Sequence, residues 1–407
     1  MKGLRSIICD PEKPQNTLKQ INHGINEKAW MQLISKKDQA IIIRKAKLPL
    51  GPGVIINSGG STGRHRQCLI PCSHLDQSAL ASAHWIKTQG LDPKNCQILN
   101  SLPLHHISGL MAWWRSRCWQ SKYISIPPSL MRNPNSLEQR CRDIGEAVKI
   151  TSLVPTQVSR LLKESAGIRW LQSFSIIWLG GSLLADNLAS AARSLDIRLA
   201  PCYGATETTA MIAVQSPKDF LIGNSNYSNL LEDIEVQLGT NNRLEVKTSR
   251  LAKAEIIDDK YEKVTNNEGW WESGDAAELI INNFDKKLRV IGRIDTAINS
   301  GGETVFPEIL EIRLLNLALQ KGIPIEEFLL VPIDHEEWGQ RFIALVRFSH
   351  ERENSDEAKL LLSLQKLAKS WPSCEQPISW HKCPDLKRNA AGKWDLKRWK
   401  SWLRQNQ

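Results

Sequence analysis

The chain has 407 residues, of which 41% are hydrophobic, and a formal net charge of +10. This length suits two or three domains with large cores, and no apolar run approaches the roughly 18 residues of a membrane span. Nine scattered cysteines, an odd number, argue against a disulfide framework, and the N-terminal apolar stretch is too short for a signal peptide. These features predict a cytoplasmic globular protein rather than a secreted or membrane-spanning one.

The first informative segment lies between residues 41 and 64. Residues 41–56 predict two strands joined by a turn at residues 49–52. The second strand runs into a loop of small and hydroxyl residues, which is Ser58, Gly59, Gly60, Ser61, Thr62 and Gly63. Its backbone N–H groups could surround the phosphates of a nucleotide as a nest, although the Gly-Lys-Ser/Thr of a Walker A motif is missing. Taken alone, the loop could equally be a flexible turn.

Potential metal ligands follow this loop. Cys68, Cys72 and His74 could form half of a zinc site, and a similar group near the C-terminus consists of Cys374, His381 and Cys383. Neither group has the tight paired spacing of a structural zinc site. Isolated thiols and surface histidines are the simpler interpretation.

Alternating strand and helix patterns in the central part of the chain predict an α/β architecture. Residues 75–88 suit a helix, whereas residues 173–179 form a short apolar run that suits a buried strand entering a loop at Gly180 and Gly181. Such alternation predicts mostly parallel sheets with flanking helices. Residues 244–277 are richer in short strand-like runs with polar turns and predict a small β subdomain.

The sequence changes character after Arg293. Pro307 begins an expected helix, strand-like runs follow at 328–333 and 342–348, and another helix is expected near 356–369. We therefore predict a large domain over residues 1–293 and a small α/β domain over residues 294–407.

Basic residues are concentrated near the C-terminus. They either mark a solvated helix face or attract a polyanionic substrate. The group is Lys382, Lys387, Arg388, Lys393, Lys397, Arg398, Lys400 and Arg404. A nucleic-acid partner is not predicted, because aromatic residues are not interleaved with Lys and Arg as in a single-strand groove.

Four further motifs follow the glycine- and serine-rich loop. They are residues 202–208 (CYGATET), 269–275 (GWWESGD), 291–303 (IGRIDTAINSGGE) and 389–393 (NAAGK). In this order the five segments resemble the adenylate-forming superfamily of acyl-CoA synthetases, luciferases and peptide-synthetase adenylation domains. One segment alone is weak evidence, but the five together span nearly the whole chain.

The resemblance implies an enzyme that joins a carboxylate to the α-phosphate of ATP, with Mg²⁺, and then transfers the acyl group to CoA. It implies that the Ser58–Gly63 loop holds the β- and γ-phosphates, that Thr206 donates to the α-phosphate, and that Glu207 binds Mg²⁺. Lys393 would be a mobile charge acting on the α-phosphate. Asp295 matches the family's hinge, about which the small domain would rotate between the two half-reactions.

The nucleoside would be held by other residues of the large domain. The resemblance implies that Tyr203 offers its flat face to adenine and that Asp275 accepts both ribose hydroxyls. Arg293 would add a donor nearby. Gly181, at the end of the buried strand, is also assigned to the nucleotide site.

The acid is indicated by residues 102–110 (LPLHHISGL), which resemble the acyl-pocket segment of o-succinylbenzoate–CoA ligases of menaquinone and phylloquinone synthesis. The resemblance implies that the acid is 2-succinylbenzoate and that His106 and Arg115 contact it. This acid carries a second carboxylate, on an aromatic ring, whose burial needs a partner charge. Arg115 matches a family arginine that could supply it. The alternative is that Arg115 and Arg117 are exposed on a helix.

Two features depart from the family. The family's phosphate loop usually continues with proline and lysine, where this chain has His65 and Arg66. Relatives also usually carry a longer segment before the loop than the 54 residues that precede Ile55. The short N-terminal segment favours an alternative function, that of a catalytically impaired nucleotide-binding homologue. The positive charge retained at Arg66 and the intact motifs favour an enzyme.

Two enzymatic alternatives remain. One is a different aryl- or acyl-CoA ligase, and the other is a free-standing adenylation enzyme that loads a carrier protein. No carrier domain follows the last motif in this sequence, which weighs against the second. The expected partners are thus an aromatic carboxylate, ATP and CoA, and the oligomeric state is left open.

Overall fold

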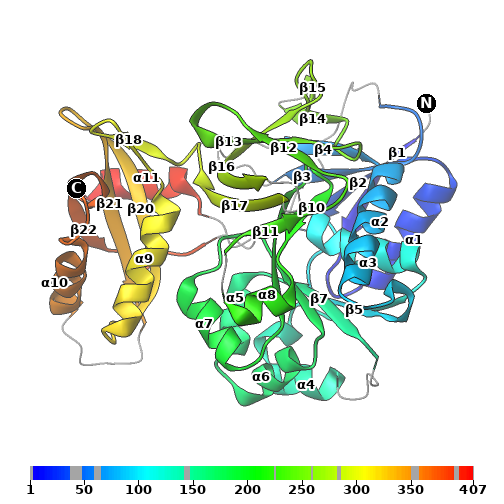
Figure 1. Ribbon diagram of the computed structural model, residues 1–407, viewed down its shortest axis with the longest axis horizontal. Helices are drawn as coiled ribbons and strands as arrows, with labels where there is room; N and C mark the ends of the chain where they lie inside the picture. Colours follow the sequence, from blue (N-terminus) through cyan, green and yellow to red (C-terminus); the bar gives the residue numbers. More distant parts are fainter. Residues whose placement is uncertain are drawn as a thin grey trace.

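The computed structural model describes residues 3–36, 48–58, 66–141, 147–223, 226–257, 260–281, 286–349, 357–388 and 394–406 (Figure 1). Within these ranges the chain forms three β-sheets with helices packed against them. Two of the sheets consist of residues before 294, and the third consists of residues after it. None of the described helices has both the length and the apolar character that a bilayer crossing requires.

The six-stranded sheet holds the strand that leads to the expected phosphate loop. Its order is β1-β2-β3-β4-β14-β15, with β1, β2 and β3 parallel and the remaining pairs antiparallel. Its strands are β1 (Leu4–Cys9), β2 (Trp30–Ser35), β3 (Gly53–Ser58), β4 (Arg66–Pro71), β14 (Ala254–Ile257) and β15 (Lys260–Lys263). Val54 and Ile56 pack against α1 (Pro14–Asn26) and α2 (Cys72–Thr88), whereas Ile55 packs on the opposite face. The β-branched run therefore forms a strand buried on both faces.

The eleven-stranded sheet carries most of the predicted motifs. Its order is β12-β13-β16-β17-β11-β10-β9-β8-β7-β5-β6. Its strands are β5 (Gln97–Asn100), β6 (Lys122–Ser125), β7 (Lys149–Leu153), β8 (Ile176–Leu179), β9 (Leu199–Ala205), β10 (Ala210–Val214), β11 (Ser228–Leu230), β12 (Glu235–Leu238), β13 (Arg243–Lys247), β16 (Trp271–Ile281) and β17 (Lys286–Arg293). Pairing is parallel from β6 to β9 and antiparallel from β9 to β12. The change occurs at β9, and the carboxyl ends of parallel strands are where α/β sheets bind ligands.

Two helices lie between these sheets. One side of α2 and of α3 (Ile107–Trp119) packs in the core of the large sheet, with Ala112 and Trp119. The other side packs in the core of the six-stranded sheet, with Met111 and Trp114. Because α3 touches both cores, it is apolar nearly all round. The other helices of this part are α4 (Pro134–Cys141), α5 (Pro155–Leu161), α6 (Ser165–Gln172), α7 (Asp186–Ser194) and α8 (Pro217–Ile222), with short 3₁₀ turns at Pro93–Asn95, Leu130–Arg132 and Thr240–Asn242.

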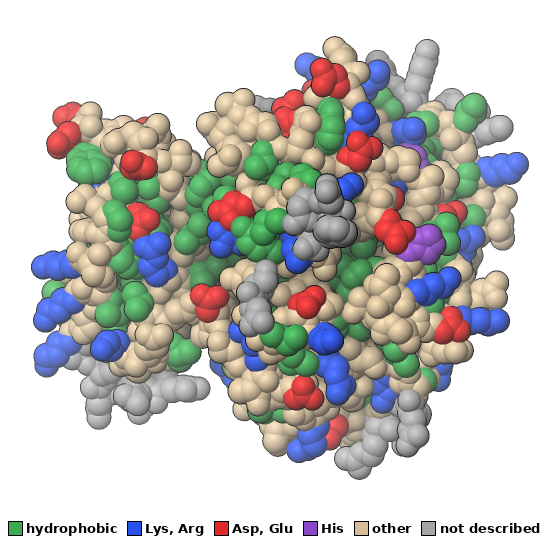
Figure 2. Space-filling model, viewed as in Figure 1, with side chains coloured by type: hydrophobic (Ala, Val, Ile, Leu, Met, Phe, Trp, Pro, Cys, Tyr) green, Lys and Arg blue, Asp and Glu red, His purple; other side chains and the backbone are tan. Residues whose placement is uncertain are grey.

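The third sheet forms a separate layer at the C-terminal end of the chain, on the left in Figure 1. Its strands run in the order β19-β18-β21-β20, and β22 pairs with β21. The elements are β18 (Ile298–Ser300), β19 (Glu303–Val305), α9 (Pro307–Gln320), β20 (Ile325–His335), β21 (Gly339–Phe348), α10 (Glu357–Ala368), a 3₁₀ turn (Ser373–Glu375), β22 (Ser379–Lys382) and α11 (Leu396–Asn406). Phe328 and Phe342 face α9 and α10, whereas Trp399 of α11 is buried on the opposite face. In the view of Figure 2, a notch lies between this C-terminal part and the rest of the molecule. Lys and Arg side chains gather on the edge of the C-terminal part that faces away from the notch.

The predicted helices and strands that fall on described residues are present, and the structure shows which strands pair in each sheet. The helix expected at 75–88 begins earlier, at Cys72, and the expected helix at Pro307 and the strands and helix after it are confirmed. The sheets are mixed, so the expected parallel strands form one half of the large sheet. The strands within residues 244–277 belong to two different sheets. β14, with its buried Ala254 and Ile256, pairs with β4 in the six-stranded sheet, whereas β13 and β16 extend the large sheet. The domain boundary at residue 293 and the strand expected before residue 48 stay predictions, the latter because residues 37–47 lie outside the described ranges.

Glu311 on α9 is a buried carboxyl group in the C-terminal part. Its side chain is 6% exposed and accepts a hydrogen bond from the Leu330 backbone N–H at 3.0 Å. Burial raises the pKa of Glu311 to about 8, against the opposing effects of this hydrogen bond and of the Arg388 charge. Because the folded state then binds more protons than the unfolded state, the free energy of unfolding falls as pH rises from about 4.3, the ordinary pKa of Glu, to about 8.

We expect Glu311→Gln to remove this pH dependence, because the amide oxygen can still accept from Leu330 but does not ionise. Urea unfolding between about pH 5 and pH 8 should show the wild-type free energy of unfolding falling relative to that of the variant. Glu326→Gln, on a more exposed side chain, is the matched control and should follow the wild type. Parallel pH profiles for Glu311→Gln and wild type would contradict the prediction.

Candidate active site

Four predicted site residues form one hydrogen-bonded network. Asp275 and Arg293 are opposite each other in the register of β16 and β17. The Tyr203 hydroxyl on β9 donates to Asp275 Oδ2 at 2.6 Å, and Arg293 Nη1 lies 3.4 Å from Asp275 Oδ1. Arg293 also donates to both carboxylate oxygens of Asp295, at 2.9 and 2.8 Å. Strand pairing therefore gathers residues from three separate sequence motifs.

The absence of a side chain at Gly274 leaves room for the Arg293 guanidinium. A Cβ at this position would lie 2.7 Å from Arg293 Nη2 and 3.0 Å from Arg293 Cζ. Any side chain here would displace the guanidinium from Asp275, which explains why a glycine precedes that aspartate.

Burial and charge fix the proton states of this network. Burial raises the pKa of the Asp275 carboxyl, while the Arg293 charge and the Tyr203 hydrogen bond oppose the rise. Burial and the neighbouring Asp275 raise the pKa of the Tyr203 phenol well above its usual range, so the phenol stays a donor. Burial alone would lower the pKa of Arg293, but Asp295 and Asp275 raise it. A carboxylate has about four acceptor sites, so Asp275 keeps the capacity to accept from hydroxyl groups.

Thr206 and Glu207 lie on the tight turn that joins β9 to β10. Thr209 and Ala210, at the end of this turn, have positive φ angles of 51° and 79°. Such angles are unfavourable for residues that carry a Cβ, and most of all for a β-branched threonine. Surrounding contacts must therefore hold the turn in this conformation.

Arg250 supplies these contacts. Its side chain is fully buried, and its Nη1 and Nη2 donate to the carbonyl oxygens of Thr208 and Met211 at 2.6 and 2.8 Å. Its Nε donates to Asp233 Oδ2 at 2.6 Å. One guanidinium thus binds both sides of the turn and is neutralised by a carboxylate.

Backbone groups around Arg250 complete the support. Thr209 Oγ1 donates to the Arg250 carbonyl at 2.6 Å, and the Ala252 N–H donates to the Glu207 carbonyl at 2.7 Å. Sequence reasoning missed Arg250, because it belongs to no recognised motif. No local signal distinguishes it from a surface arginine at the end of a strand.

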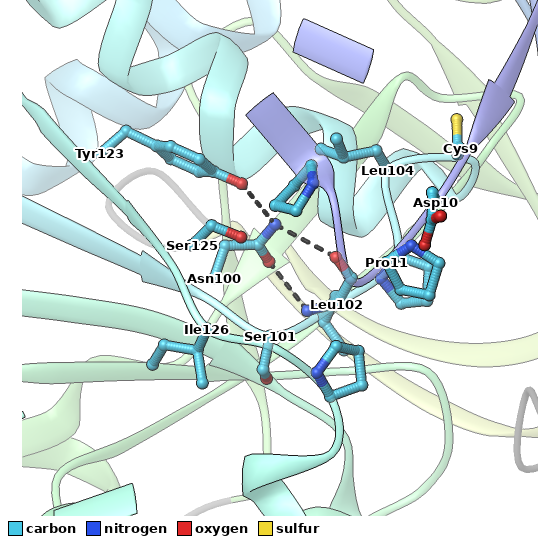
Figure 3. Close-up of a pocket in the computed structure, with 13 residues that line it drawn as sticks. Cys9, Asp10, Pro11, Asn100, Ser101, Leu102, Leu104, Tyr123, Ser125 and Ile126 are labelled. Carbon is cyan, nitrogen blue, oxygen red and sulfur yellow. Dashed lines mark hydrogen bonds between the residues drawn. The ribbon is translucent and has the colours of Figure 1, made fainter. Parts of the chain in front are cut away.

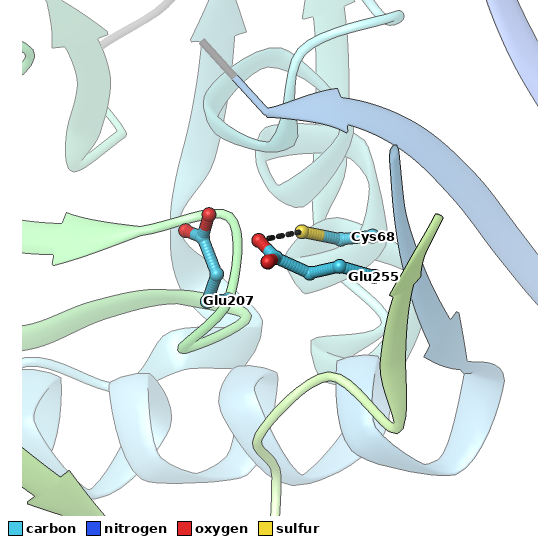
Figure 4. A group of neighbouring side chains, drawn as sticks. All are labelled: Cys68, Glu207 and Glu255. Carbon is cyan, nitrogen blue, oxygen red and sulfur yellow. Dashed lines mark hydrogen bonds between the residues drawn. The ribbon is translucent and has the colours of Figure 1, made fainter. Parts of the chain in front are cut away.

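The turn places Glu207 beside Cys68 and Glu255, with one ligand atom of each residue within 4.8 Å of the others (Figure 4). Burial raises the pKa of Glu255 to about 7, and the nearby Glu207 charge adds to the rise. Oxygen ligands from carboxylates are what Mg²⁺ prefers. Glu207 therefore fits the ion that the family resemblance implies, and Glu255, which sequence reasoning also missed, is a second carboxylate at the same place.

The expected phosphate loop is described only at its two ends. Gly59, Gly60, Ser61, Thr62 and Gly63 lie outside the described residues. Ser58 ends β3 and is opposite Arg66 in the register of β3 and β4, so these two residues flank the loop. The loop's role in binding phosphates stays a prediction.

Gly181 follows β8 with a φ of 91°, a conformation that favours glycine. A Cβ here would lie 3.3 Å from a methyl group of Val154. The chain turns at this point, at the carboxyl end of a parallel strand. The structure thus explains the glycine by its backbone, and its nucleotide contact stays a prediction.

His106 precedes α3, and its ring centroid lies 4.4 Å from that of His105. Burial, with a smaller effect of His106, lowers the pKa of His105 to about 4, so His105 is neutral at physiological pH. The two rings lie against each other just before the helix that carries Arg115.

Arg115 is buried, with 4% of its surface exposed, so the exposed-helix alternative does not hold for it. Its Nε donates to Ser82 Oγ at 3.1 Å, and its guanidinium carbon lies 4.5 Å from the ring centroid of Trp178. No acidic side chain in the described part of the chain pairs with it, and burial lowers the pKa of Arg115 to about 10. Arg117, by contrast, is partly exposed and pairs with Asp76 at 3.6 Å.

Asn100 fixes the neighbouring segment 102–110. Its side-chain nitrogen donates to the Leu102 carbonyl oxygen and to the Tyr123 hydroxyl, and its oxygen accepts from the Leu102 N–H (Figure 3). The same nitrogen also donates to the Gly109 carbonyl oxygen. The adjoining cavity has a volume of about 20 Å³. That is room for about one water molecule, so this cavity does not hold an aromatic acid.

Lys393 lies outside the described residues, so its position relative to the network is not part of the structure described. Asp295 lies between β17 and β18, where the chain passes from the large sheet to the third sheet. This location suits the hinge that the sequence predicts, and the hinge itself stays a prediction.

Comparisons with known proteins agree on one family. A family model described as AMP-binding enzyme matches residues 9–235. The 2-succinylbenzoate–CoA ligase of Escherichia coli (strain K12) is 27% identical over 350 residues, which cover 86% of this chain and 69% of that protein. The ligase of the same name from Haemophilus influenzae is 27% identical over 398 residues, which cover 94% of this chain and 78% of that protein.

Solved structures show the same fold. The o-succinylbenzoate CoA synthetase of Bacillus subtilis, in complex with its acyl-adenylate intermediate, has a TM-score of 0.78 at 18% identity, covering 98% of this chain and 87% of that one. The same enzyme with ATP and magnesium ion has a TM-score of 0.70 at 19% identity, covering 98% and 89%. These likenesses confirm the predicted α/β fold.

We expect Arg250→Met to destabilise the protein, because it removes the cation that neutralises Asp233 and the donor to the carbonyl groups of Thr208 and Met211. Breaking a buried ion pair in this way costs about 3–5 kcal/mol of the free energy of unfolding, which urea denaturation would measure. Arg289→Met is the matched control, because the Arg289–Glu278 pair is about 40% exposed on both sides and should contribute about 0–1 kcal/mol. Equal losses in the two variants would contradict the role given to Arg250.

Proposed function

Because the chain belongs to the AMP-binding enzyme family, we propose that it is an ATP-dependent acid–thiol ligase. Its substrates are 2-succinylbenzoate and CoA, and its products are 2-succinylbenzoyl-CoA, AMP and pyrophosphate. The substrate assignment is supported by relatives named 2-succinylbenzoate–CoA ligase, whose alignments cover most of the chain. It is also supported by Arg115, a buried arginine without an acidic partner among the described residues. The nine free cysteines favour a reducing compartment, so we place the reaction in the cytoplasm.

In the first half-reaction, a carboxylate oxygen of the acid attacks the α-phosphorus of ATP, and the bond to the pyrophosphate oxygen breaks. Asp275 accepts from the ribose hydroxyls, with Arg293 held beside it and Tyr203 against the adenine. Thr206 donates to the α-phosphate. Catalysis here is mainly positioning and neutralisation of charge.

The phosphates need positive charge as well as donors. The Ser58–Gly63 loop holds the β- and γ-phosphates, and Arg66 supplies a cation beside it. Glu207 holds Mg²⁺, which when bound neutralises phosphate charge. Lys393 supplies the remaining cation at the α-phosphate once the C-terminal part closes on the site.

In the second half-reaction, the CoA thiol attacks the acyl carbon. The thiol proton passes to solvent, the bond from that carbon to the AMP oxygen breaks, and AMP leaves. Lys393 must withdraw to open this path, which a rotation at Asp295 would allow. The exposed cations of the C-terminal part suit the negative charge of CoA.

The reaction is tested directly by incubating the protein with ATP, Mg²⁺, CoA and 2-succinylbenzoate and measuring the mass of the thioester. We expect the 2-succinylbenzoyl-CoA mass, dependent on every component. Benzoate, cinnamate and a short fatty acid serve as matched acids that lack the second carboxylate. If these acids react well and 2-succinylbenzoate does not, the substrate assignment is wrong while the ligase reaction stands.

Arg115→Ala should impair the use of 2-succinylbenzoate, because the ring carboxylate would be buried without a partner. That typically costs about 3–5 kcal/mol, which lowers kcat/KM by two or more orders of magnitude. Binding of ATP should barely change. Arg117→Ala, two residues along the same helix, is the control and should retain activity. An equal loss of ATP binding in Arg115→Ala would point to a general structural role instead.

A further inference from the structure

Cys68, Glu255 and Ser58 project from one face of the six-stranded sheet. Cys68 is directly opposite Glu255 in the register of β4 and β14. Ser58 is opposite Arg66, two residues from Cys68, and so lies diagonally from the thiol on the same face. The β9–β10 turn brings Glu207 over this face from the large sheet.

The spacing of the donor atoms is close to that of a metal site. The Cys68 Sγ lies 3.9 Å from Glu255 Oε1, and the donor atoms of all three residues lie within 4.8 Å of one another (Figure 4). Around a tetrahedral ion with bonds of about 2.3 Å to sulfur and about 2.1 Å to oxygen, donor atoms are separated by about 3.4–3.6 Å. Small side-chain rotations of the two glutamates would close the remaining gap.

Ser58 provides an independent sign that this place takes a ligand. Its residue is 9% exposed, and its Oγ is buried without a hydrogen-bond partner of ordinary geometry in the described structure. The hydroxyl nevertheless lies near enough to Cys68 to act on the pKa of that thiol. A buried hydroxyl oxygen without a donor is costly, and a bound cation or its water would satisfy it.

Charge and access also suit a cation. The charges near Glu255 include the carboxylates of Glu207 and the more distant Glu262 and the cation of Arg66, which opposes their effect. Arg66, a second cation, Lys263, and Glu255 line a polar cavity of about 330 Å³, together with Glu272 and Asn266. An ion can therefore reach the carboxylate of Glu255 from solvent.

We propose that Cys68, Glu207 and Glu255 form a binding site for a thiophilic divalent cation such as Cd²⁺ or Zn²⁺. Binding forms one bond from the metal to the Cys68 sulfur and bonds to carboxylate oxygens, and the thiol proton passes to solvent. A thiolate beside two carboxylates selects borderline and soft ions over Mg²⁺. Because Glu207 is shared with the proposed Mg²⁺ position, such an ion would compete with the adenylation reaction.

The test titrates the full-length protein with Cd²⁺ alone, in the absence of ATP, CoA and acid, and follows the ultraviolet charge-transfer absorbance of a cadmium–thiolate bond. We expect saturation at one Cd²⁺ per chain. Cys68→Ser should lose this signal, and Glu255→Gln should weaken binding at least tenfold. Cys72→Ser removes another buried thiol nearby and should retain the wild-type signal.

Circular dichroism and urea unfolding of each variant establish that the fold is kept. The proposal is overturned if wild type shows no saturable signal, if Cys68→Ser retains it, or if Glu255→Gln binds as tightly as wild type. Because the titration contains no substrate, none of these outcomes bears on the ligase reaction, which the thioester assay tests separately.

Discussion

The buried guanidinium of Arg250 is the constraint on which the site depends. The turn after β9 has two non-glycine residues with positive φ, a conformation its own sequence disfavours. Arg250 stabilises it by donating to two carbonyl oxygens of that segment while Asp233 balances its charge. The chain around Arg250 also passes from β13 of the large sheet to β14 of the six-stranded sheet. Arg250 therefore stabilises the turn and lies in the segment that connects the two sheets, between which Glu207 is placed.

The packing of α3 between the sheets has a comparable consequence for the acyl site. A helix that touches two apolar cores keeps only a small solvated face, which on α3 carries Arg117, and a charge elsewhere on the helix must lie between the cores. Arg115 is buried there, with Ser82 and the Trp178 ring as its described contacts. A cation held in this way is expensive unless an anion joins it. The proposed substrate carboxylate would offset this cost, and a buried arginine in this helix therefore supports an anionic substrate better than an exposed arginine does.

The sequence predicts site residues that belong to its motifs, and strand pairing then makes residues of different motifs neighbours in space. Asp275 and Arg293 lie on adjacent antiparallel strands, and the glycine before Asp275 is explained by the space that Arg293 needs. The sequence offered Cys68 only as part of a zinc group with Cys72 and His74. Its contact with Glu255 could not be predicted, because the two residues are 187 positions apart and meet only through the pairing of β14 with β4. Alternation of apolar residues identifies β14 as a strand but does not say which sheet it joins. The same limit explains why residues 244–277 were expected in one subdomain and are divided between two sheets.

Arg293 links the nucleoside site to the predicted hinge. Its guanidinium is shared between Asp275, proposed to accept from ribose, and Asp295, at the passage to the third sheet. A rotation at this proposed hinge would alter the two hydrogen bonds between Asp295 and Arg293 and, with them, the position of the Arg293 guanidinium beside Asp275. In the proposed mechanism, occupation of the ribose site and the position of the C-terminal part would therefore be coupled through Arg293. Such a coupling would be reciprocal, because a nucleotide that drew Arg293 away from Asp295 would favour the rotated arrangement by the same free energy by which that arrangement favoured the nucleotide.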